Sequence, residues 1–242
     1  IETRVLIGTP FLEIVHDVLR NGRDLVIRLA EQHDWLDRVF GGDDMHLLRK
    51  CPCPVWLIKS GAPKAFRRIL AAVDVGDGYP EREMESRQAL NRQILEMASS
   101  LALADFAELH IVHTWDAIGE GILRQGVFIS APENEINAYV EKTRRHHADC
   151  LNSLLAEVAR GTVKDALDYL EPESHLVKGP ARREIPALAS RIGADLVVMG
   201  TVVRTGVSGF IMGNTAETIL GQIDCSVLAI KPPGFVTPVR LD

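Results

Sequence analysis

The sequence has few of the features that mark nucleic-acid-binding, membrane or disulfide-rich proteins. Its 242 residues carry 27 Lys and Arg against 33 Asp and Glu, with no basic stripe and only 5% aromatic residues, which excludes nucleic acid as the main partner. No apolar run approaches the roughly 20 residues of a membrane span. Four cysteines without a disulfide-framework spacing indicate a reducing compartment. We therefore expect a cytoplasmic protein with neither a nucleic-acid nor a membrane partner.

The sequence also lacks the motifs of common enzyme classes. It contains no Walker lysine loop, nucleophile elbow, Ser-His-Asp order or paired-carboxylate motif. None of its eight histidines has zinc-ligand spacing with the cysteines. His110 and His113 lie three apart on a predicted strand and point to opposite faces, and His146 and His147 diverge on a predicted helix. We predict no catalytic residue and no metal, and a zinc site assembled in three dimensions stays open.

A long internal repeat is the most informative feature that the sequence does contain. Residues 5–26, VLIGTPFLEIVHDVLRNGRDLV, match residues 176–197, LVKGPARREIPALASRIGADLV, at an offset of 171, which becomes 172 further on. The shared residues include the pairs Gly8 and Gly179, Glu13 and Glu184, Gly22 and Gly193, Gly41 and Gly213, Cys53 and Cys225, and Lys59 and Lys231. Self-similarity of this length indicates domain duplication.

The two copies differ in completeness. Residues 66–231 contain all the elements of one unit, residues 1–62 contain only the closing part of a first unit, and residues 232–242 form a tail that we expect on the surface. An incomplete first copy would expose a sheet edge and an apolar face. We therefore expect roughly 60–80 further residues before Ile1 in the natural protein.

Strand and helix signals alternate along residues 66–231, which predicts an α/β fold with an open five-stranded parallel sheet and helices on both faces. Short apolar runs predict strands at 69–73, 109–115, 174–177, 196–199 and 227–230. Helical periodicity predicts helices at 83–103, 133–159, 181–192 and 214–223. Residues 116–132 contain three glycines and are predicted to form an inserted loop.

Two strand ends carry the candidate binding residues. Asp74 follows the first strand, and the fourth opens into GTVVRTGVSGFIMGNTAE at residues 200–217. Ligands of open parallel sheets bind outside the carboxyl ends of the strands, and a glycine loop before a helix offers N–H groups to a phosphate. Alternatives stay open at this stage, because the glycines also suit turns, Asn214 suits a helix cap, and Arg204 is either a phosphate contact or an exposed arginine.

These features resemble the universal stress protein family, with its adenine nucleotide α-hydrolase-like fold. The resemblance rests on the Ala-Val-Asp end of the first strand, the Gly200 loop, the closing Cys-Ser-Val-Leu strand and the tandem arrangement. In nucleotide-binding members the Asp contacts adenosine. The phosphates are held by a motif of three glycines, in which two residues separate the first glycine from the second, nine separate the second from the third, and Ser or Thr follows the third. Val203 replaces the middle glycine and Asn214 the Ser or Thr. By position, the resemblance implies that ATP or another adenine nucleotide is bound by Asp74, Thr114, Gly200, Thr201, Arg204, Gly213, Asn214 and Thr215.

The first copy lacks these binding features. Leu29 stands where the second copy has Gly200, and Glu31, Asp34 and Asp37 follow it. Carboxylates repel a phosphate, so we expect no nucleotide in this copy. Its last strand, within residues 51–59, is expected to pair with the last strand of the second copy, as last strands do at dimer interfaces of the family. A further homodimer stays open.

The resemblance implies a cytoplasmic stress-response module that binds a small molecule in its second copy and is not a dedicated enzyme. Two alternatives remain: a structural or interaction protein whose loops bind nothing, and a cavity that holds another small molecule, a lipid or a metal. Weak ATP hydrolysis also remains open.

Overall fold

The structure is a computed structural model that describes residues 2–30, 42–125, 132–161, 164–201 and 213–241. Within these ranges the chain forms one seven-stranded sheet and eight helices. The strands are β1 (Val26–Leu29), β2 (Val55–Ile58), β3 (Arg68–Ala72), β4 (Glu108–Trp115), β5 (Glu173–Lys178), β6 (Leu196–Gly200) and β7 (Ser226–Ile230). The helices are α1 (Pro10–Asn21), α2 (Gly42–Lys50), α3 (Glu81–Asp105), α4 (Glu120–Gln125), α5 (Glu133–Val158), α6 (Lys164–Leu170), α7 (Ala181–Ile192) and α8 (Asn214–Leu220).

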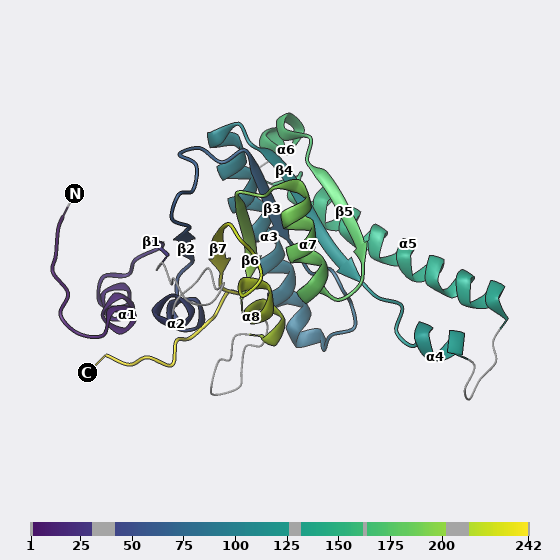
Figure 1. The fold of residues 1–242 in the computed structure, drawn as a ribbon, viewed down its shortest axis with the longest axis horizontal. Helices are drawn as coiled ribbons and strands as arrows, with labels where there is room; N and C mark the ends of the chain where they lie inside the picture. The colour runs from purple at the N-terminus through teal and green to yellow at the C-terminus, as the bar shows by residue number, and fades with distance from the viewer. Residues whose placement is uncertain (1, 31–41, 126–131, 162–163, 202–212, 242) are drawn as a thin grey trace.

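The sheet has the strand order β1-β2-β7-β6-β3-β4-β5 (Figure 1). Strands β3 to β7 are mutually parallel, which confirms the predicted α/β fold. β3 to β7 are the five strands predicted for residues 66–231, and β1 and β2 of the N-terminal segment extend the sheet beyond β7 to seven strands. β2 runs antiparallel to β7, as expected for paired last strands. This pairing provides hydrogen-bond partners for backbone N–H and C=O groups that would otherwise be unpaired at the edge of the sheet.

The register of the sheet repeats between the two ends of the sequence. Val26 pairs with Val55 across β1 and β2, and Val197 pairs with Val227 across β6 and β7. These two pairs are the ones that the sequence offsets relate to each other. We propose that the two segments are copies of one unit, and the shared register supports this proposal.

Glycines shared by the two copies occupy the same backbone conformations. Gly22 and Gly193 end α1 and α7 in the left-handed region, with φ of 59° and 62°. Gly8 and Gly179 also have positive φ, and an added Cβ at either would lie within 2.9 Å of a glutamate side chain of the following helix. Only glycine combines this φ with so close an approach, which explains why the repeat retains these positions.

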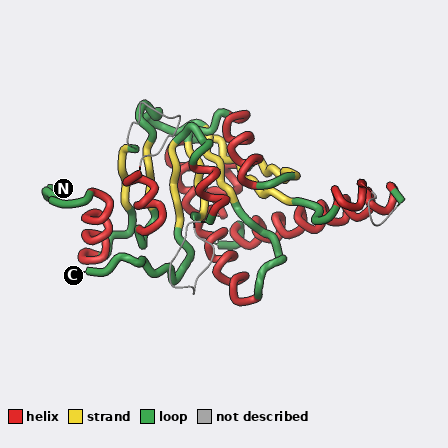
Figure 2. Tube along the Cα trace, turned by 60° about the horizontal axis from the view of Figure 1, so that its bottom comes forward, coloured by secondary structure: helices red, strands yellow, loops and turns green. Residues whose placement is uncertain are grey.

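Helices cover both faces of the sheet. One buried cluster joins residues of α1, α2, α7 and α8 to one face, and a second joins residues of α3, α5 and α6 to the opposite face. Both chain ends lie beside α1 (Figure 2). There Nε2 of His16 lies 3.2 Å from the carbonyl oxygen of Arg240. The C-terminal tail therefore packs against α1.

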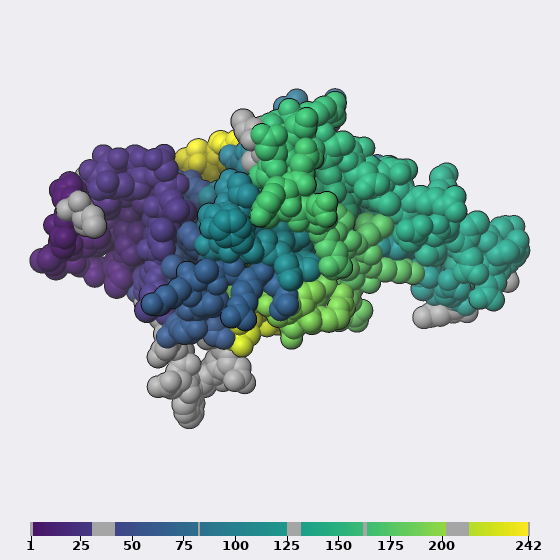
Figure 3. Space-filling view, turned by 90° about the horizontal axis from the view of Figure 1, so that it is seen from above, coloured from purple at the N-terminus to yellow at the C-terminus, as the bar shows by residue number. Residues whose placement is uncertain are grey.

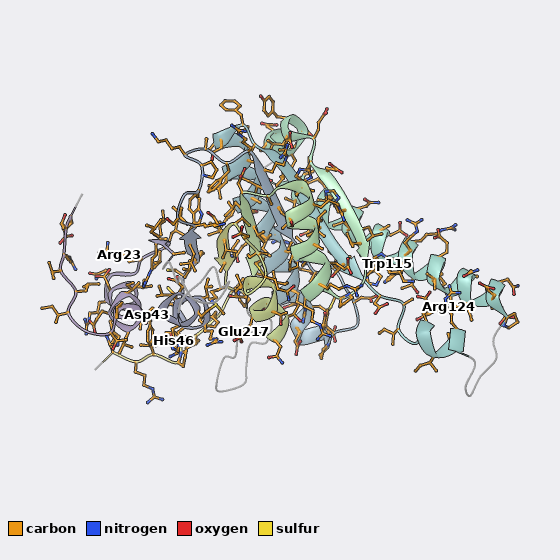
Figure 4. All side chains as sticks on the ribbon, in the orientation of Figure 1. Arg23, Asp43, His46, Trp115, Arg124 and Glu217 are labelled. Atoms are coloured by element: carbon orange, nitrogen blue, oxygen red, sulfur yellow. The ribbon has the colours of Figure 1, made fainter. Side chains whose placement is uncertain are left out.

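Two short helices, α4 and α6, lie where the sequence predicts none. α4 falls within the predicted loop 116–132 and is attached to α5 by Arg124, which donates hydrogen bonds of 2.9 Å to both Glu120 and Asn137 (Figure 4). α6 buries Leu167. Helices of six or seven residues are marginal alone and depend on such contacts, so their sequences show little periodicity.

The molecule is elongated, with the N-terminal segment and the α4–α5 arm at opposite ends (Figure 3). β1 forms the sheet edge at the N-terminal end, where the side chains of Ile27 and Leu29 are 57% and 64% exposed. β1 therefore presents apolar side chains at an edge of the sheet. Within the described ranges, no helix is at once long and apolar enough to cross a membrane.

Candidate functional site

A cavity of about 350 Å³ lies at the carboxyl ends of β3, β4 and β6. It is lined by six of the predicted site residues: Asp74, Thr114, Gly200, Thr201, Gly213 and Thr215. Asn214 begins α8 but does not line the cavity, and Arg204 and Val203 lie outside the described residues. The fold thus gathers residues from three strand ends and the start of α8 around one space.

Asp74 is held in place through its backbone. Its N–H donates to Oδ1 of Asn91 at 3.0 Å, and Nδ2 of Asn91 donates back to the carbonyl oxygen of Asp74 at 2.7 Å. Asn91 is buried on α3, where both halves of its amide are satisfied by this pairing. The two bonds fix the direction in which the chain leaves β3.

The carboxylate of Asp74 is already engaged by three donors. It accepts hydrogen bonds from Arg87 at 2.6 Å, from the hydroxyl of Tyr79 at 2.9 Å and from the N–H of Gly76 at 3.2 Å. The guanidinium carbon of Arg87 also lies 3.2 Å from the centre of the Tyr79 ring. Burial and the charge of Asp74 raise the pKa of Tyr79, so its hydroxyl stays a donor. A ligand that contacts Asp74 therefore meets a carboxylate whose charge is offset by Arg87 and whose side chain remains 47% exposed.

Thr201 connects the cavity to the N-terminal segment. Its buried hydroxyl accepts a hydrogen bond from Nζ of Lys231 at 2.7 Å, and the same amine donates to the carbonyl oxygen of Leu48 in α2. Burial lowers the pKa of Lys231 to about 7. The hydroxyl of Thr201 is thus committed to Lys231, although the residue lines the cavity as predicted.

The glycine loop has local structural roles at both of its described ends. Gly213 is the N-cap of α8, and its N–H donates to the carbonyl oxygen of Thr201 at 3.2 Å. The capping role considered for Asn214 is wrong, because Asn214 already belongs to the helix and no side-chain capping bond is present at this end. Gly200 approaches α3 so closely that an added Cβ would lie 2.6 Å from Cδ2 of Leu90. Packing alone therefore favours glycine at position 200, because any larger residue would displace the Leu90 side chain.

We expect Gly200→Ala to lower the free energy of unfolding by about 1–3 kcal/mol, since the new methyl group overpacks against Leu90. Urea unfolding of the wild type and the variant measures this loss. Gly78→Ala is the matched control, because a Cβ at Gly78 has no heavy atom of the described chain within 4 Å. In a Leu90→Ala background the cost of Gly200→Ala should nearly vanish, and an unchanged cost there would contradict the packing explanation.

Several polar residues beside the cavity could not be recognised as site residues from the sequence. Arg87 and Asn91 lie four apart on one face of α3, a spacing that also suits a solvated helix face. His113 lines the cavity from β4, and its Nε2 lies 2.9 Å from Nδ1 of His147 in α5. Burial lowers the pKa of His113. His146 instead contacts Asp77 at 2.7 Å, in line with the predicted divergence of the two adjacent histidines.

In the N-terminal segment, the predicted acidic loop with Glu31, Asp34 and Asp37 lies outside the described residues. Asp44, which follows it, is fully buried and forms an ion pair of 3.0 Å with Arg28. α2 also contacts the second copy through an ion pair between Arg49 and Glu217, which lies on α8 beside α2 (Figure 4). An ion pair therefore links α2 to the same helix that begins at the cavity.

The sequence profile described as the Universal stress protein family matches residues 65–231, the segment that contains β3 to β7 and the cavity. This chain belongs to the universal stress protein family. The resemblance seen in the sequence is thereby confirmed. Universal stress protein E of Escherichia coli K12 is 34% identical over 235 residues, which cover 96% of this chain and 68% of that protein.

Two further comparisons extend over both segments of this universal stress protein. A Universal stress protein E homolog of Haemophilus influenzae is 32% identical over 221 residues, covering 90% of this chain and 65% of the homolog. The crystal structure of a functionally unknown protein from Pseudomonas aeruginosa PAO1 matches with a TM-score of 0.67 at 27% identity. That match covers 94% of this chain and 69% of the other. The similarity therefore includes the N-terminal segment, which the family profile does not match.

Proposed function

We propose that this universal stress protein is a cytoplasmic stress-response module that binds an adenine nucleotide in the cavity at the ends of β3, β4 and β6. The observation that carries the proposal is the convergence of Asp74, Thr114, Gly200 and Thr215 on one cavity. Parallel sheets bind ligands at this edge, and the cavity volume lies within the range of small-molecule sites. The four free cysteines, three of them buried, fit a reducing compartment.

The distribution of polar and apolar groups in the cavity supports a nucleoside. Asp74, Tyr79 and Arg87 lie on its β3 side, and Gly213 and Thr215 lie at the start of α8. Apolar side chains, Ile94, Ile185, Met199 and Ile219 among them, line the remainder. A base suits the apolar part, a ribose hydroxyl can donate to Asp74, and phosphates are directed toward the Gly213 side.

We propose binding rather than catalysis as the function of this cavity. Asp74 is the single acidic residue among the described lining residues, and its pairing with Arg87 suits a ligand contact better than a general base. The apolar lining also favours a second candidate, an uncharged small molecule or a lipid chain. Weak hydrolysis of a bound nucleotide is tested by assaying phosphate release from ATP.

Isothermal titration with ATP and with adenosine tests the proposal. Asp74→Ala removes a charged hydrogen-bond acceptor and should weaken adenosine binding by about 10–100-fold. Adenosine is needed beside ATP, because the variant also frees Arg87, which can then attract phosphates. Asp77→Ala is the matched control, since Asp77 is exposed, pairs with His146 and does not line this cavity. A wild type that binds neither ligand, or an Asp74→Ala variant with undiminished adenosine affinity, contradicts the proposal. Mass spectrometry of material released on denaturation then identifies any other occupant.

A further inference from the structure

A second cluster of potential ligands lies apart from the cavity, on the β4–β5 pair. His110 of β4 stands directly opposite Glu173 of β5, and His175 lies two residues further along β5. Alternation along the strands places these side chains on one face of the sheet. None of the three lines the cavity. Because 65 residues separate His110 from His175, the sheet register and not sequence spacing brings them together.

The three side chains approach one another as metal ligands do. Nδ1 of His110 lies 3.0 Å from Nε2 of His175 and 3.5 Å from Oε2 of Glu173. Nε2 of His175 lies 3.7 Å from Oε1 of Glu173. Ligands about 2.0–2.1 Å from a tetrahedral zinc ion stand about 3.3 Å from one another. The separations of 3.0, 3.5 and 3.7 Å, the last two to different oxygens of Glu173, lie near this spacing, and one atom from each of the three residues lies within 4.8 Å of the other two.

The far nitrogen of His110 gives an independent indication. Nε2 of His110 is buried, and within the described chain it has no hydrogen-bond partner, although the residue is only 7% exposed. An oxygen of Glu108 lies 3.8 Å away, and Glu108 is held by Arg68 at 2.8 Å. A ligating histidine commonly directs its other N–H to a carboxylate in this way. With Nδ1 on a metal, Nε2 would carry the proton and point to Glu108.

Two arginines lie near the cluster. The carboxylate of Glu108 is paired with Arg68, and Arg191 of α7 lies close enough for its charge to act on His175. Two imidazoles and one carboxylate remain as donors, a set that suits zinc and related divalent ions better than calcium or magnesium.

We propose that His110, Glu173 and His175 bind a divalent transition metal ion, with zinc as the expected ion and water in the fourth position. The ion would tie the edge strand β5 to β4. The prediction of no metal from the sequence is revised accordingly, because it rested on spacings within single elements.

Titration of the chelator-treated protein with Co²⁺, followed by displacement with Zn²⁺, tests this site. The wild type should bind one Co²⁺ in this cluster with the intense visible absorption of four-coordinate cobalt, and Zn²⁺ should abolish the absorption. Glu173→Gln and His175→Ala should each weaken binding at least tenfold, since removing even an outer partner of a ligand costs 10–100-fold. Zn²⁺ should also raise the Tm of the wild type more than that of either variant.

Two matched variants serve as controls. Glu171→Gln changes an exposed carboxylate two residues before Glu173, and His146→Ala removes a histidine on α5 that pairs with Asp77. Both should bind Co²⁺ as the wild type does. Should His175→Ala fail to fold by circular dichroism, Glu173→Gln decides, because Glu173 is exposed. The proposal is overturned by a wild type that binds no Co²⁺, or by a Glu173→Gln variant with the affinity of the wild type.

Discussion

The free energy of unfolding of the wild type is expected to rise by about 4 kcal/mol between pH 7 and pH 10, and replacing Lys231 by methionine should remove this rise. The amine of Lys231 is buried between the end of β7, Thr201 and α2, and burial lowers its pKa from the ordinary 10.5 to about 7. Between these two values the unfolded chain binds the proton and the folded chain does not. Raising the pH therefore stabilises the folded state by about 1.4 kcal/mol per unit until the unfolded lysine also loses its proton.

Urea unfolding of the wild type and of Lys231→Met at several pH values measures this contribution as a difference, which cancels other groups that titrate in the same range. Lys59→Met is the matched control, because Lys59 is the equivalent residue of the first copy and its amine pairs with Asp224 at the surface. Its removal should leave the pH dependence of the wild type unchanged. Parallel curves for the wild type and Lys231→Met would contradict a buried neutral amine.

Lys59 and Lys231 illustrate what the sequence determines and what it leaves to the fold. The repeat relates them as equivalents, and both follow interior strands of the sheet, yet Lys231 is buried whereas Lys59 is partly exposed. The expected pairing of the two last strands did not indicate that the carbonyl oxygen of Leu48 in α2 would lie against the amine of Lys231. The α/β class with a parallel sheet, by contrast, follows from the alternation of apolar runs and helices.

The sequence predicted helix boundaries correctly where a proline precedes the helix and a glycine follows it. α7 spans the predicted residues 181–192, because Pro180 precedes it and Gly193 ends it. α8 ends at Leu220, three residues before the predicted end at Ile223, because Gly221 is its C-cap. α4 and α6 are too short for a periodic pattern to emerge.

The candidate site was predictable only at the strand ends. Asp74 and Gly200 follow apolar runs that are recognisable as strands, so their meeting at one edge could be expected. Arg87 and Asn91 reach that edge from the middle of a helix, and nothing in their spacing distinguishes a face toward the cavity from a face toward solvent. The pairing of His110 with His175 requires the β4–β5 register, which one sequence does not specify.

We expect Leu57→Ala in β2 to lower the free energy of unfolding by about 2–5 kcal/mol, the range for truncating a buried leucine. Leu57 is fully buried and pairs with Val227 of β7. The same core cluster contains Leu48 of α2 and Leu220 of α8, the equivalent residues of the two copies. Since one core crosses from copy to copy, the whole chain should unfold in a single transition. Leu29→Ala is the matched control, because Leu29 lies on β1 with its side chain 64% exposed and should change stability little.

Tryptophan fluorescence separates the two copies in this experiment. The chain has three tryptophans, of which Trp56 lies on β2 and Trp115 on β4. Variants in which Trp35 and one of these two are replaced therefore report on the N-terminal segment or on the second copy alone. Both probes should give the same urea midpoint, and Leu57→Ala should shift both equally. Two separate midpoints would mean that the N-terminal segment folds apart from the cavity. A shared midpoint would mean that β1, β2 and α2 are integral to the sheet that positions the cavity. The N-terminal segment would then be required for the cavity of the second copy.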